Sequence, residues 1–340
     1  MLSTSSAIEY YKNDPSLLYK EAYDICQEVF QDKVYIRGLI EYTNYCTCDC
    51  QYCGIRRSNS KVNRYRLSIE SILNVIDEGV KKGIKTFVLQ GGEDPEFNTK
   101  QMLLLLTQIR KKYGNSLAIT LSCGQKTKQD YQDLFEAGAN RYLMRFETSN
   151  QKLYERMKNG QKLSSRLNAL ENLKAIGYET GSGYMTGLPS ETDEVRINNA
   201  LMSKEFGFDM LGIGPFIPHP DTPLGTAKQE PLEYAIRGTA LLRVLLPYSN
   251  IPATTAAGTL EQNGREQMLK AGANVLMPNL TPTDNKKDYL LYPNKICIDE
   301  SGFQCIGCMT IRTLSIGKKI SLDRGDSQEF HRRQNVQEPN

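Results

Sequence analysis

Three closely spaced cysteines are the first feature of this chain that indicates chemistry. Cys46, Cys50 and Cys53 form a Cys-x3-Cys-x2-Cys pattern, and Cys48 lies between the first two. In a reducing compartment, grouped thiols favour a metal centre over a disulfide. A 4Fe-4S cluster usually takes four cysteines, so three ligands would leave one iron open to a small molecule. We therefore expect a catalytic iron–sulfur cluster on Cys46, Cys50 and Cys53.

Zinc is the main alternative at this group, because sulfur ligation alone does not select the metal. Cys48 offers a second triplet, Cys-x-Cys-x2-Cys, and ordinary surface thiols are also compatible with the spacing. The spacing favours the cluster and leaves these alternatives open.

A second cysteine group lies near the end of the chain. Cys297, Cys305 and Cys308 form Cys-x7-Cys-x2-Cys, which again offers three thiol ligands. The group predicts an accessory metal site that binds 4Fe-4S, 2Fe-2S or zinc, and we assign no catalysis to it.

The elements that would position these groups follow a repeating pattern. From residue 34 onward, short apolar β-branched runs alternate with segments of helical period, as in a parallel sheet built from βα units. Eight such runs indicate an α/β fold with a closed (βα)8 barrel of the TIM type, whose active face is the carboxyl end of the strands. The predicted strands are 34–42, 86–89, 118–122, 141–145, 178–185, 210–213, 251–254 and 274–277.

The segments between the strands have the periodicity of amphipathic helices. Ile69, Ile72, Leu73, Ile76 and Val80 recur at offsets 3, 4, 7 and 11, which places them on one face of a helix. Such a stripe would pack against a sheet. A doubly wound open sheet is compatible with the same periodicity.

Both ends of the chain fall outside the barrel pattern. Residues 1–33 predict one helix with Pro15 near its first turn, and such a helix could plug the bottom of the barrel. The barrel would then occupy 34–314. From 315 to 340 the chain is polar and lacks apolar period, so we expect a short, loosely held tail. We assign no function to its Arg-Gly-Asp sequence at 324–326.

The charge of the chain and its lack of long apolar runs argue against two classes of partner, nucleic acid and membranes. There are 42 basic and 39 acidic residues, a net charge of +3, and the charges are interspersed along the sequence. Nucleic acid is therefore not the expected partner. No segment approaches the roughly 18 consecutive apolar residues of a membrane span, and the N-terminus has no signal-peptide pattern. We expect an oxygen-sensitive cytoplasmic protein, or one from another reducing, anaerobic compartment.

The first cysteine group has a close parallel in a known superfamily. Its spacing, with Tyr52 directly before the third cysteine, resembles the radical S-adenosylmethionine (radical SAM) signature. A Gly-Gly-Glu motif at Gly91, Gly92 and Glu93 follows the second predicted strand and resembles the motif that contacts the methionine amino group in that superfamily. The resemblance implies two cofactors, a 4Fe-4S cluster and S-adenosylmethionine (SAM).

Within the superfamily, the chain resembles the HydE family of FeFe-hydrogenase maturases, which is related to biotin synthase and methylornithine synthase. Long stretches at 178–189, 209–223 and 251–256 carry this resemblance. It implies that a 5′-deoxyadenosyl radical acts on a cysteine-ligated iron carbonyl cyanide precursor, Fe(CO)2(CN), during H-cluster maturation.

The resemblance also assigns roles to residues that would contact SAM. Arg37 and Tyr289 would flank the adenosyl end, Glu147 would contact the ribose, and Arg166 would pair with the methionine carboxylate. These residue types suit the contacts, because carboxylates accept bonds from hydroxyls and Arg pairs bidentately with carboxylates. Arg145 lies two residues before Glu147, so both would point to the same side of a strand.

A substrate wall and an accessory cluster are implied in the same way. Met210, Thr254 and Thr255 resemble the family's cavity wall, and the second cysteine group resembles an accessory iron–sulfur site found in some members. The implied partners are a small iron complex as substrate, a reductant protein such as ferredoxin or flavodoxin, and other hydrogenase maturation proteins.

Two other functions are compatible with the sequence. One is a radical SAM mutase or sulfur-inserting enzyme of the methylornithine synthase or biotin synthase type, which differs in the substrate that triggers SAM cleavage. The other is an iron–sulfur scaffold or carrier without turnover. A carrier has no need of the Gly-Gly-Glu motif or the ribose and carboxylate contacts, so we favour the enzyme.

Overall fold

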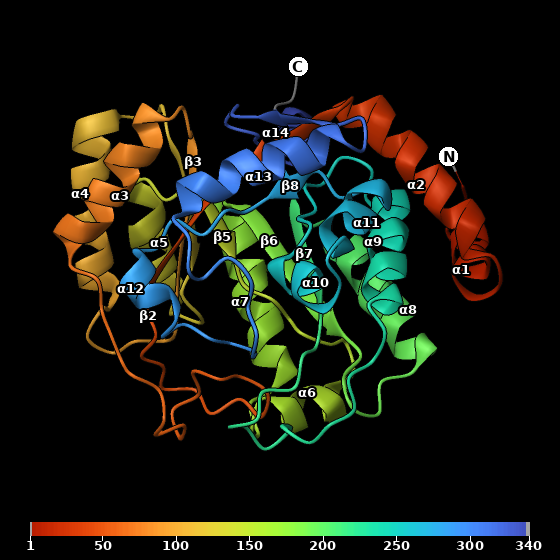
Figure 1. Cartoon of the computed structure of the whole chain (residues 1–340), viewed down its shortest axis with the longest axis horizontal. Helices are drawn as coiled ribbons and strands as arrows, with labels where there is room; N and C mark the ends of the chain where they lie inside the picture. The colour runs from red at the N-terminus through yellow and green to blue at the C-terminus, as the bar shows by residue number, and fades with distance from the viewer. Residues whose placement is uncertain (1, 338–340) are drawn as a thin grey trace.

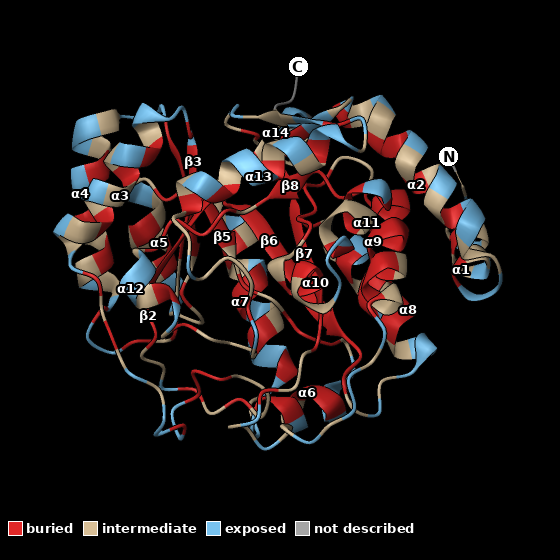
Figure 2. Ribbon diagram, viewed as in Figure 1, coloured by how far each residue is buried: buried red, intermediate tan, exposed pale blue. Residues whose placement is uncertain are grey.

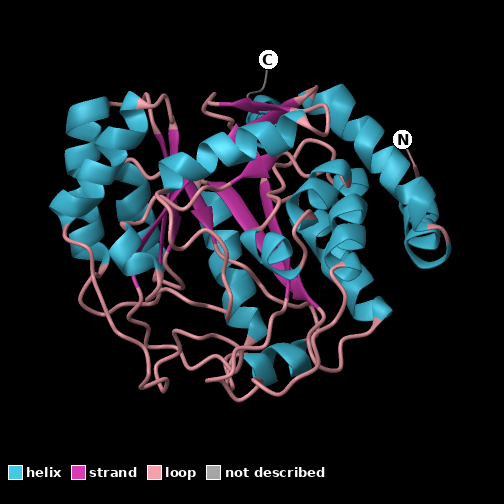
Figure 3. Ribbon diagram, in the orientation of Figure 1, coloured by secondary structure: helices cyan, strands magenta, loops and turns pink. Residues whose placement is uncertain are grey.

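The computed structural model describes residues 2–337; Met1 and residues 338–340, the outer ends of the predicted extension and tail, lie outside the described residues. Its centre is a sheet of six parallel strands whose spatial order follows their order in the sequence (Figures 1 and 3). The strands are β2 (Gly38–Thr43), β3 (Thr86–Gly91), β4 (Ala118–Ser122), β5 (Arg141–Leu143), β6 (Glu179–Thr186) and β7 (Met210–Pro215).

A second sheet and several isolated bridges continue this arrangement toward a barrel. The strands β1 (Lys33–Ile36), β8 (Val275–Leu276) and β9 (Lys319–Ser321) form a three-stranded sheet in the order β8-β1-β9. Parallel bridges pair Met210 with Asn250, Pro252 with Val275, and Leu39 with Asn279. These bridges link the two sheets on both sides, so the predicted α/β barrel architecture is confirmed.

Two of the predicted strands are less regular than expected. The run 34–42 appears as β1 and β2, which are separated at Arg37. Backbone pairing still crosses this break, since Arg37 N donates to Leu276 O at 3.0 Å. The run 251–254 contributes a single isolated bridge, between Pro252 and Val275, and Pro252 has no N–H to donate to a ladder.

Helices follow the strands and cover the outer face of the sheet (Figure 1). The predicted stripes are buried, with Ile72 and Ile76 on α3 and Leu105 and Ile109 on α4. The longer helices between the strands are α3 (Ile69–Lys81), α4 (Thr99–Tyr113), α5 (Lys128–Glu136), α7 (Leu163–Ile176), α8 (Asp193–Phe206) and α9 (Glu233–Leu245). Short helices occupy other connections: α6 (Gln151–Met157), α10 (Thr255–Leu260), α11 (Gly264–Lys270) and α12 (Thr283–Lys286).

The N-terminal extension forms two helices where one was expected. Helix α1 (Thr4–Asn13) ends before Asp14, and Pro15 then occupies the first position of α2 (Pro15–Phe30), where its missing N–H costs little. Helix α2 packs against α9 on the side of the molecule (Figure 1). It therefore does not plug the barrel.

The C-terminal segment closes the amino-terminal ends of the strands, which we call the floor. After α13 (Gly302–Leu314), β9 pairs with β1, and α14 (Gln328–Gln337) follows. Between them, residues 323–327, the floor segment, reach into the strand ends. Arg324 O accepts a bond from Thr86 Oγ1 at 2.7 Å, and Asp326 Oδ1 lies 2.5 Å from Arg141 Nη2. The expectation of a loosely held tail was therefore wrong.

Burial is concentrated in the strands, while the helices expose their outer faces (Figure 2). Every residue of β2, β6 and β7 is buried. Among the described residues, we find no helix with the length and apolar character needed to cross a bilayer.

Candidate active site

The first cysteine group lies in the loop that follows β2, at the carboxyl end of the sheet. All three thiols are free, and Cys50 is buried while Cys46 and Cys53 are partly exposed. Backbone bonds hold the loop at both ends: Thr47 N donates to Glu93 O at 3.0 Å, and Gln51 N donates to Met157 O at 2.9 Å. The loop is thus fixed between the end of β3 and the end of α6.

Two of the three proposed thiol ligands, Cys50 and Cys53, are poor anions without a bound cation. Burial raises the pKa of Cys53 to about 12, and a hydrogen bond with Cys48, together with burial, raises the pKa of Cys50 far above the usual value for a thiol. The Cys48 thiol lowers the pKa of Cys46 against the effect of burial. A metal centre supplies positive charge and deprotonates its thiol ligands, so these groups fit metal binding.

A single zinc ion requires close spacing of its thiol ligands. Zinc–sulfur bonds are about 2.3 Å, so two sulfurs on one ion lie at most about 4.6 Å apart. Among the described residues, the metal-ligand group whose atoms all lie within 4.8 Å of one another is at Cys297, Glu300 and Cys305. Cys46, Cys50 and Cys53 do not form such a close group in the described part of the chain.

The Gly-Gly-Glu motif interlocks with the cysteine loop. A Cβ on Gly92 would lie 2.1 Å from Tyr45 O and 2.7 Å from Cys46 Cβ, so only glycine fits there. Glu93 N lies 3.4 Å from Cys46 Sγ, and Glu93 Oε1 accepts a bond from Gln125 N at 3.1 Å. A Cβ on Gly91 would likewise lie 2.8 Å from Thr43 Cγ2. The motif is therefore held against the predicted cluster ligands.

Glu147 has a strained backbone and a carboxylate oxygen that accepts no hydrogen bond. Its φ of 67° is left-handed, which costs a non-glycine residue about 1–3 kcal/mol. Tyr52, from the cysteine loop, donates to Oε1 at 3.2 Å. The other oxygen, Oε2, is buried without a hydrogen bond, although Arg145 Nη2 lies 3.2 Å away in a poorer geometry. This oxygen is a free acceptor suited to a ribose hydroxyl.

Arg166 and Tyr289 approach the same end of the sheet. Arg166 Nε donates to Tyr154 Oη at 3.1 Å. Burial would lower the pKa of Arg166, but this effect is outweighed by Tyr154 and by the charges of Glu93 and Glu147, and the net pKa is raised. Gln90 Nε2 donates to Tyr289 Oη at 3.4 Å. The structure thus brings Arg166, Tyr289 and Glu147 near the Gly-Gly-Glu motif.

Arg37 and Met210 lie at the other end of the strands. Arg37 Nη1 donates to Met210 Sδ at 2.9 Å, and Arg37 Nη2 donates to Gly325 O at 3.2 Å. The six residues of β2 separate Arg37 from the cysteine loop, a length of about 20 Å at about 3.3 Å per residue. We therefore correct the expectation that Arg37 flanks the adenosyl end. Met210 also lies at the amino-terminal end of the strands, and not at the end that carries the cysteine loop.

The two threonines of the expected substrate wall are partly buried at the start of α10. Thr254 Oγ1 lies 3.4 Å from a Cβ built on Gly214 of β7, so Thr254 faces this strand. Thr255 Oγ1 accepts a bond from Arg265 Nη2 at 3.2 Å. Both hydroxyls are close to the carboxyl end of β7.

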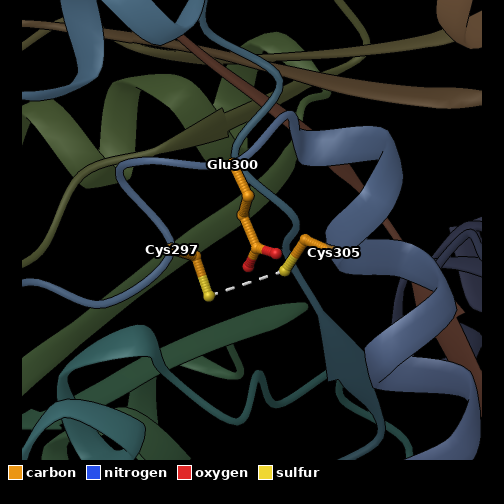
Figure 4. A group of neighbouring side chains, drawn as sticks. All are labelled: Cys297, Glu300 and Cys305. Atoms are coloured by element: carbon orange, nitrogen blue, oxygen red, sulfur yellow. Dashed lines mark hydrogen bonds between the residues drawn. The ribbon is translucent and has the colours of Figure 1, made fainter.

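The second cysteine group includes a carboxylate that we did not predict. Cys305 Sγ lies 3.6 Å from Cys297 Sγ, and Glu300 points toward both sulfurs (Figure 4). Cys308 is exposed and does not belong to this close group. The position of Glu300 between Cys297 and Cys305 in the sequence was the available signal. Glu300, and not Cys308, is therefore the third group that lies close to Cys297 and Cys305.

Comparisons with known proteins agree with this geometry. The model of the radical SAM superfamily matches residues 40–200. The chain is 44% identical over 308 residues to the FeFe hydrogenase maturase subunit HydE of Thermotoga maritima, covering 91% of this chain and 88% of that protein. It is 28% identical over 271 residues to 3-methylornithine synthase of Methanosarcina acetivorans, covering 79% of this chain and 75% of that protein.

Solved structures share the fold. A crystal structure of methylornithine synthase has a TM-score of 0.82 at 24% identity and covers 94% of both chains. A crystal structure of the hydrogenase maturase HydG has a TM-score of 0.75 at 18% identity, over 94% of this chain and 77% of that one. With the cysteine loop and Gly-Gly-Glu motif in contact, and with 44% identity to a HydE over nearly the whole chain, this protein is a radical SAM enzyme of the HydE family.

Proposed function

We propose that this enzyme cleaves SAM reductively as a step in the maturation of FeFe-hydrogenase. The observation that carries the role in maturation is the 44% identity to a HydE over 91% of the chain. The interlocked cysteine loop and Gly-Gly-Glu motif support SAM cleavage as the chemistry, because together they offer three thiolates beside a carboxylate and backbone groups.

The residues at the carboxyl end of the strands divide the binding of SAM among them. Cys46, Cys50 and Cys53 would hold a 4Fe-4S cluster, which supplies the electron that splits the sulfonium and yields a 5′-deoxyadenosyl radical. The main chain at Gly91 and Gly92, with Glu93, would hold the methionine amino group. These groups sit on rigid strand ends, which suits the orientation of a reactive cofactor.

The other end of SAM would meet the remaining polar groups. Arg166 is buried beside Glu93 and Glu147 and would pair with the methionine carboxylate. Glu147 would accept from the ribose through Oε2, which accepts no hydrogen bond in the structure, and Arg145 would support this carboxylate. Tyr289 would lie at the adenosyl end.

We propose a cysteine-ligated Fe(CO)2(CN) complex as the substrate. Thr254 and Thr255 offer hydroxyls at the carboxyl end of β7, and Arg265 adds a cation next to Thr255. Such groups suit an anionic iron complex. Met210, on the floor, would contact it only if the complex reaches the amino-terminal end of the strands.

The substrate is tested by the dependence of turnover on added compounds. Reconstituted enzyme with SAM and dithionite is incubated with the iron precursor, with lysine or with dethiobiotin, and 5′-deoxyadenosine is measured. We expect the precursor to increase SAM cleavage at least tenfold, measured as the sum of 5′-deoxyadenosine and of any adenosylated cysteine product that mass spectrometry detects, with a dealkylated cysteine product as the counterpart of 5′-deoxyadenosine. Stimulation by lysine or dethiobiotin alone would instead assign the mutase or sulfur-insertion reaction.

We propose further that Cys297, Glu300 and Cys305 bind an accessory metal. The three ligand atoms lie within 4.8 Å of one another, as for ligands of one ion. Metal analysis of the Cys297→Ser variant should show the loss of one metal site with the first cluster retained. Unchanged iron and zinc contents would contradict this accessory site.

We propose further that the enzyme depends on other proteins for its electron and for the use of its product. The electron donor would be a ferredoxin or flavodoxin, and other hydrogenase maturation proteins would receive the product. The enzyme would work in the cytoplasm under reducing conditions, and its open cluster would make it sensitive to oxygen.

A further inference from the structure

We infer that Lys158 is a positioning residue that holds Cys50 and sets the reduction potential of the cluster. Lys158 Nζ lies 3.1 Å from Cys50 Sγ, although the two residues are 108 positions apart in the sequence. The inference rests on the proposed binding of a 4Fe-4S cluster at Cys50.

The environment of Lys158 suits a thiolate partner. Only 7% of the residue is exposed, and a buried ammonium is costly unless a charged or polar group pairs with it. Among the described residues, no carboxylate lies within ion-pair distance of Lys158 Nζ, and Cys50 Sγ is its hydrogen-bond acceptor. A cysteine that ligates iron is a thiolate and supplies the missing negative charge.

The segment that carries Lys158 is fastened to the cysteine loop at several other points. Gln51 N donates to Met157 O at 2.9 Å, and Gln51 Nε2 donates to Asn159 Oδ1 at 3.3 Å. Gln161 Nε2 lies 3.5 Å from Cys48 Sγ. These contacts fix the end of α6 against the loop, so the backbone of Lys158 is held within reach of Cys50.

The turn after α6 requires a special backbone. Lys158 is the C-cap residue of α6, and its N–H donates to Tyr154 O. Asn159 and Gly160 then adopt positive φ angles of 53° and 86°. This turn reverses the chain and brings both flanking residues, Lys158 and Gln161, to the cysteine loop.

The expected effect follows from the charge of the cluster. Hydrogen bonds to the sulfur ligands and nearby charge set iron–sulfur potentials. A buried ammonium that donates to a ligand sulfur stabilises the more negative, reduced cluster. Removal of this group should therefore lower the reduction potential and make the cluster harder to reduce.

The test is a redox titration followed by EPR on the reconstituted full-length protein. We expect Lys158→Met to shift the reduction equilibrium at least tenfold toward the oxidised cluster, which is about 59 mV for a one-electron couple. Lys158→Arg, which keeps the charge and the donor, should recover at least half of this shift. Lys162→Met is the matched control, because Lys162 is exposed and pairs with Glu155.

Different outcomes separate this inference from the proposed function. Iron and sulfide are counted first, and Cys50→Ala must lose the cluster if the proposed ligands are right. If Lys158→Met keeps its cluster and its potential equals that of the wild type, the inference is wrong. Reduced SAM affinity with an unchanged potential would also overturn it, since Lys158 would then serve the substrate. If Lys158→Met does not retain a cluster, Lys158→Gln is titrated and judged by the same criterion.

Discussion

At the scale of single residues, the carboxylate of Glu93 depends on a glycine in the neighbouring loop. A Cβ on Gly124 would lie 2.1 Å from Glu93 Cγ and 2.4 Å from Oε1, and Gly124 has a φ of 77°. The next residue, Gln125, donates its N–H to the same Oε1. The loop after β4 thus sets the position of the group that would hold the methionine amino group.

Gly124→Ala should therefore weaken the binding of SAM. We expect the dissociation constant, measured by calorimetry on the reconstituted enzyme, to rise at least tenfold because the new methyl group displaces Glu93. Gly114→Ala is the matched control, since Gly114 also has a left-handed φ of 54° but no atom lies within 4 Å of a Cβ there. Both variants should lose more than about 1 kcal/mol of stability from backbone strain. Equal SAM affinities in the two variants would contradict the role of Gly124.

Asp209 is a buried acid whose charge opposes folding. Burial raises its pKa to about 7, although Arg333 and the N–H of Thr180 act in the opposite direction. The pKa of an unfolded Asp is about 3.9. Between these two pKa values, the folded chain binds a proton at Asp209 that the unfolded chain has released. The resulting contribution of Asp209 to the free energy of unfolding is complete below about pH 4 and is lost as the pH rises through about 7.

Asp209→Asn should remove this part of the pH dependence. The unfolding free energy of the wild type, relative to that of the variant, should fall between pH 4 and pH 7 by at most about 1.4 kcal/mol per pH unit. Denaturant titrations at pH 5 and pH 7 measure the difference. A difference that is the same at both pH values would show that Asp209 does not change its protonation on unfolding.

At the scale of elements, the floor segment satisfies charges that the strands bury at their amino-terminal ends. Arg141 is fully buried and pairs with Glu179 at 2.7 Å as well as with Asp326. Gly325 O accepts bonds from Arg37 and from Asn250 Nδ2. Because buried cations need partners, the segment is part of the barrel and not an appendage.

Asp326→Ala should destabilise the fold through this network. Removal of one partner of a fully buried pair costs about 3–5 kcal/mol, and we expect about 2 kcal/mol because Arg141 keeps Glu179 and the Asp326 side chain is 28% exposed. Asp323→Ala is the control: its exposed carboxylate lies 3.6 Å from Lys33, and an exposed pair contributes less than about 1 kcal/mol. Urea unfolding compares the two. Similar losses of stability would argue against the floor network.

The sequence predicts the regular elements well because their signal is local. β-branched runs locate the strands, and Gly138, Gly177 and Gly272 mark helix ends with φ angles near 105° (104°, 110° and 102°). The floor segment has no such signal, since its contacts are bonds from backbone groups and single polar side chains to residues far away in the sequence. The pairing of Lys158 with Cys50 is equally invisible, because only the fold brings the two residues together.

At the scale of the whole molecule, the two ends of the strands have different tasks. The cysteine loop, the Gly-Gly-Glu motif, Glu147 and Arg166 lie at the carboxyl end, as is usual for active sites of this architecture, and charged pairs close the amino-terminal end. Because of this division, Arg37 does not lie at the end of the strands where SAM is proposed to bind. Its residue type suited a cofactor contact, but its position at the start of β2 places it on the floor.

Cys46, Cys50 and Cys53 are the proposed ligands in the cysteine loop, and Cys48, in the same loop, supplies the matched control. Wild type, Cys50→Ala and Cys48→Ala are reconstituted anaerobically with iron and sulfide, reduced with dithionite and mixed with SAM, and 5′-deoxyadenosine is measured by chromatography. We predict that Cys50→Ala loses both the cluster and the product, while Cys48→Ala forms product at a rate comparable to that of the wild type. Product from Cys50→Ala at the wild-type rate, or its loss from Cys48→Ala alone, would contradict the proposed active site.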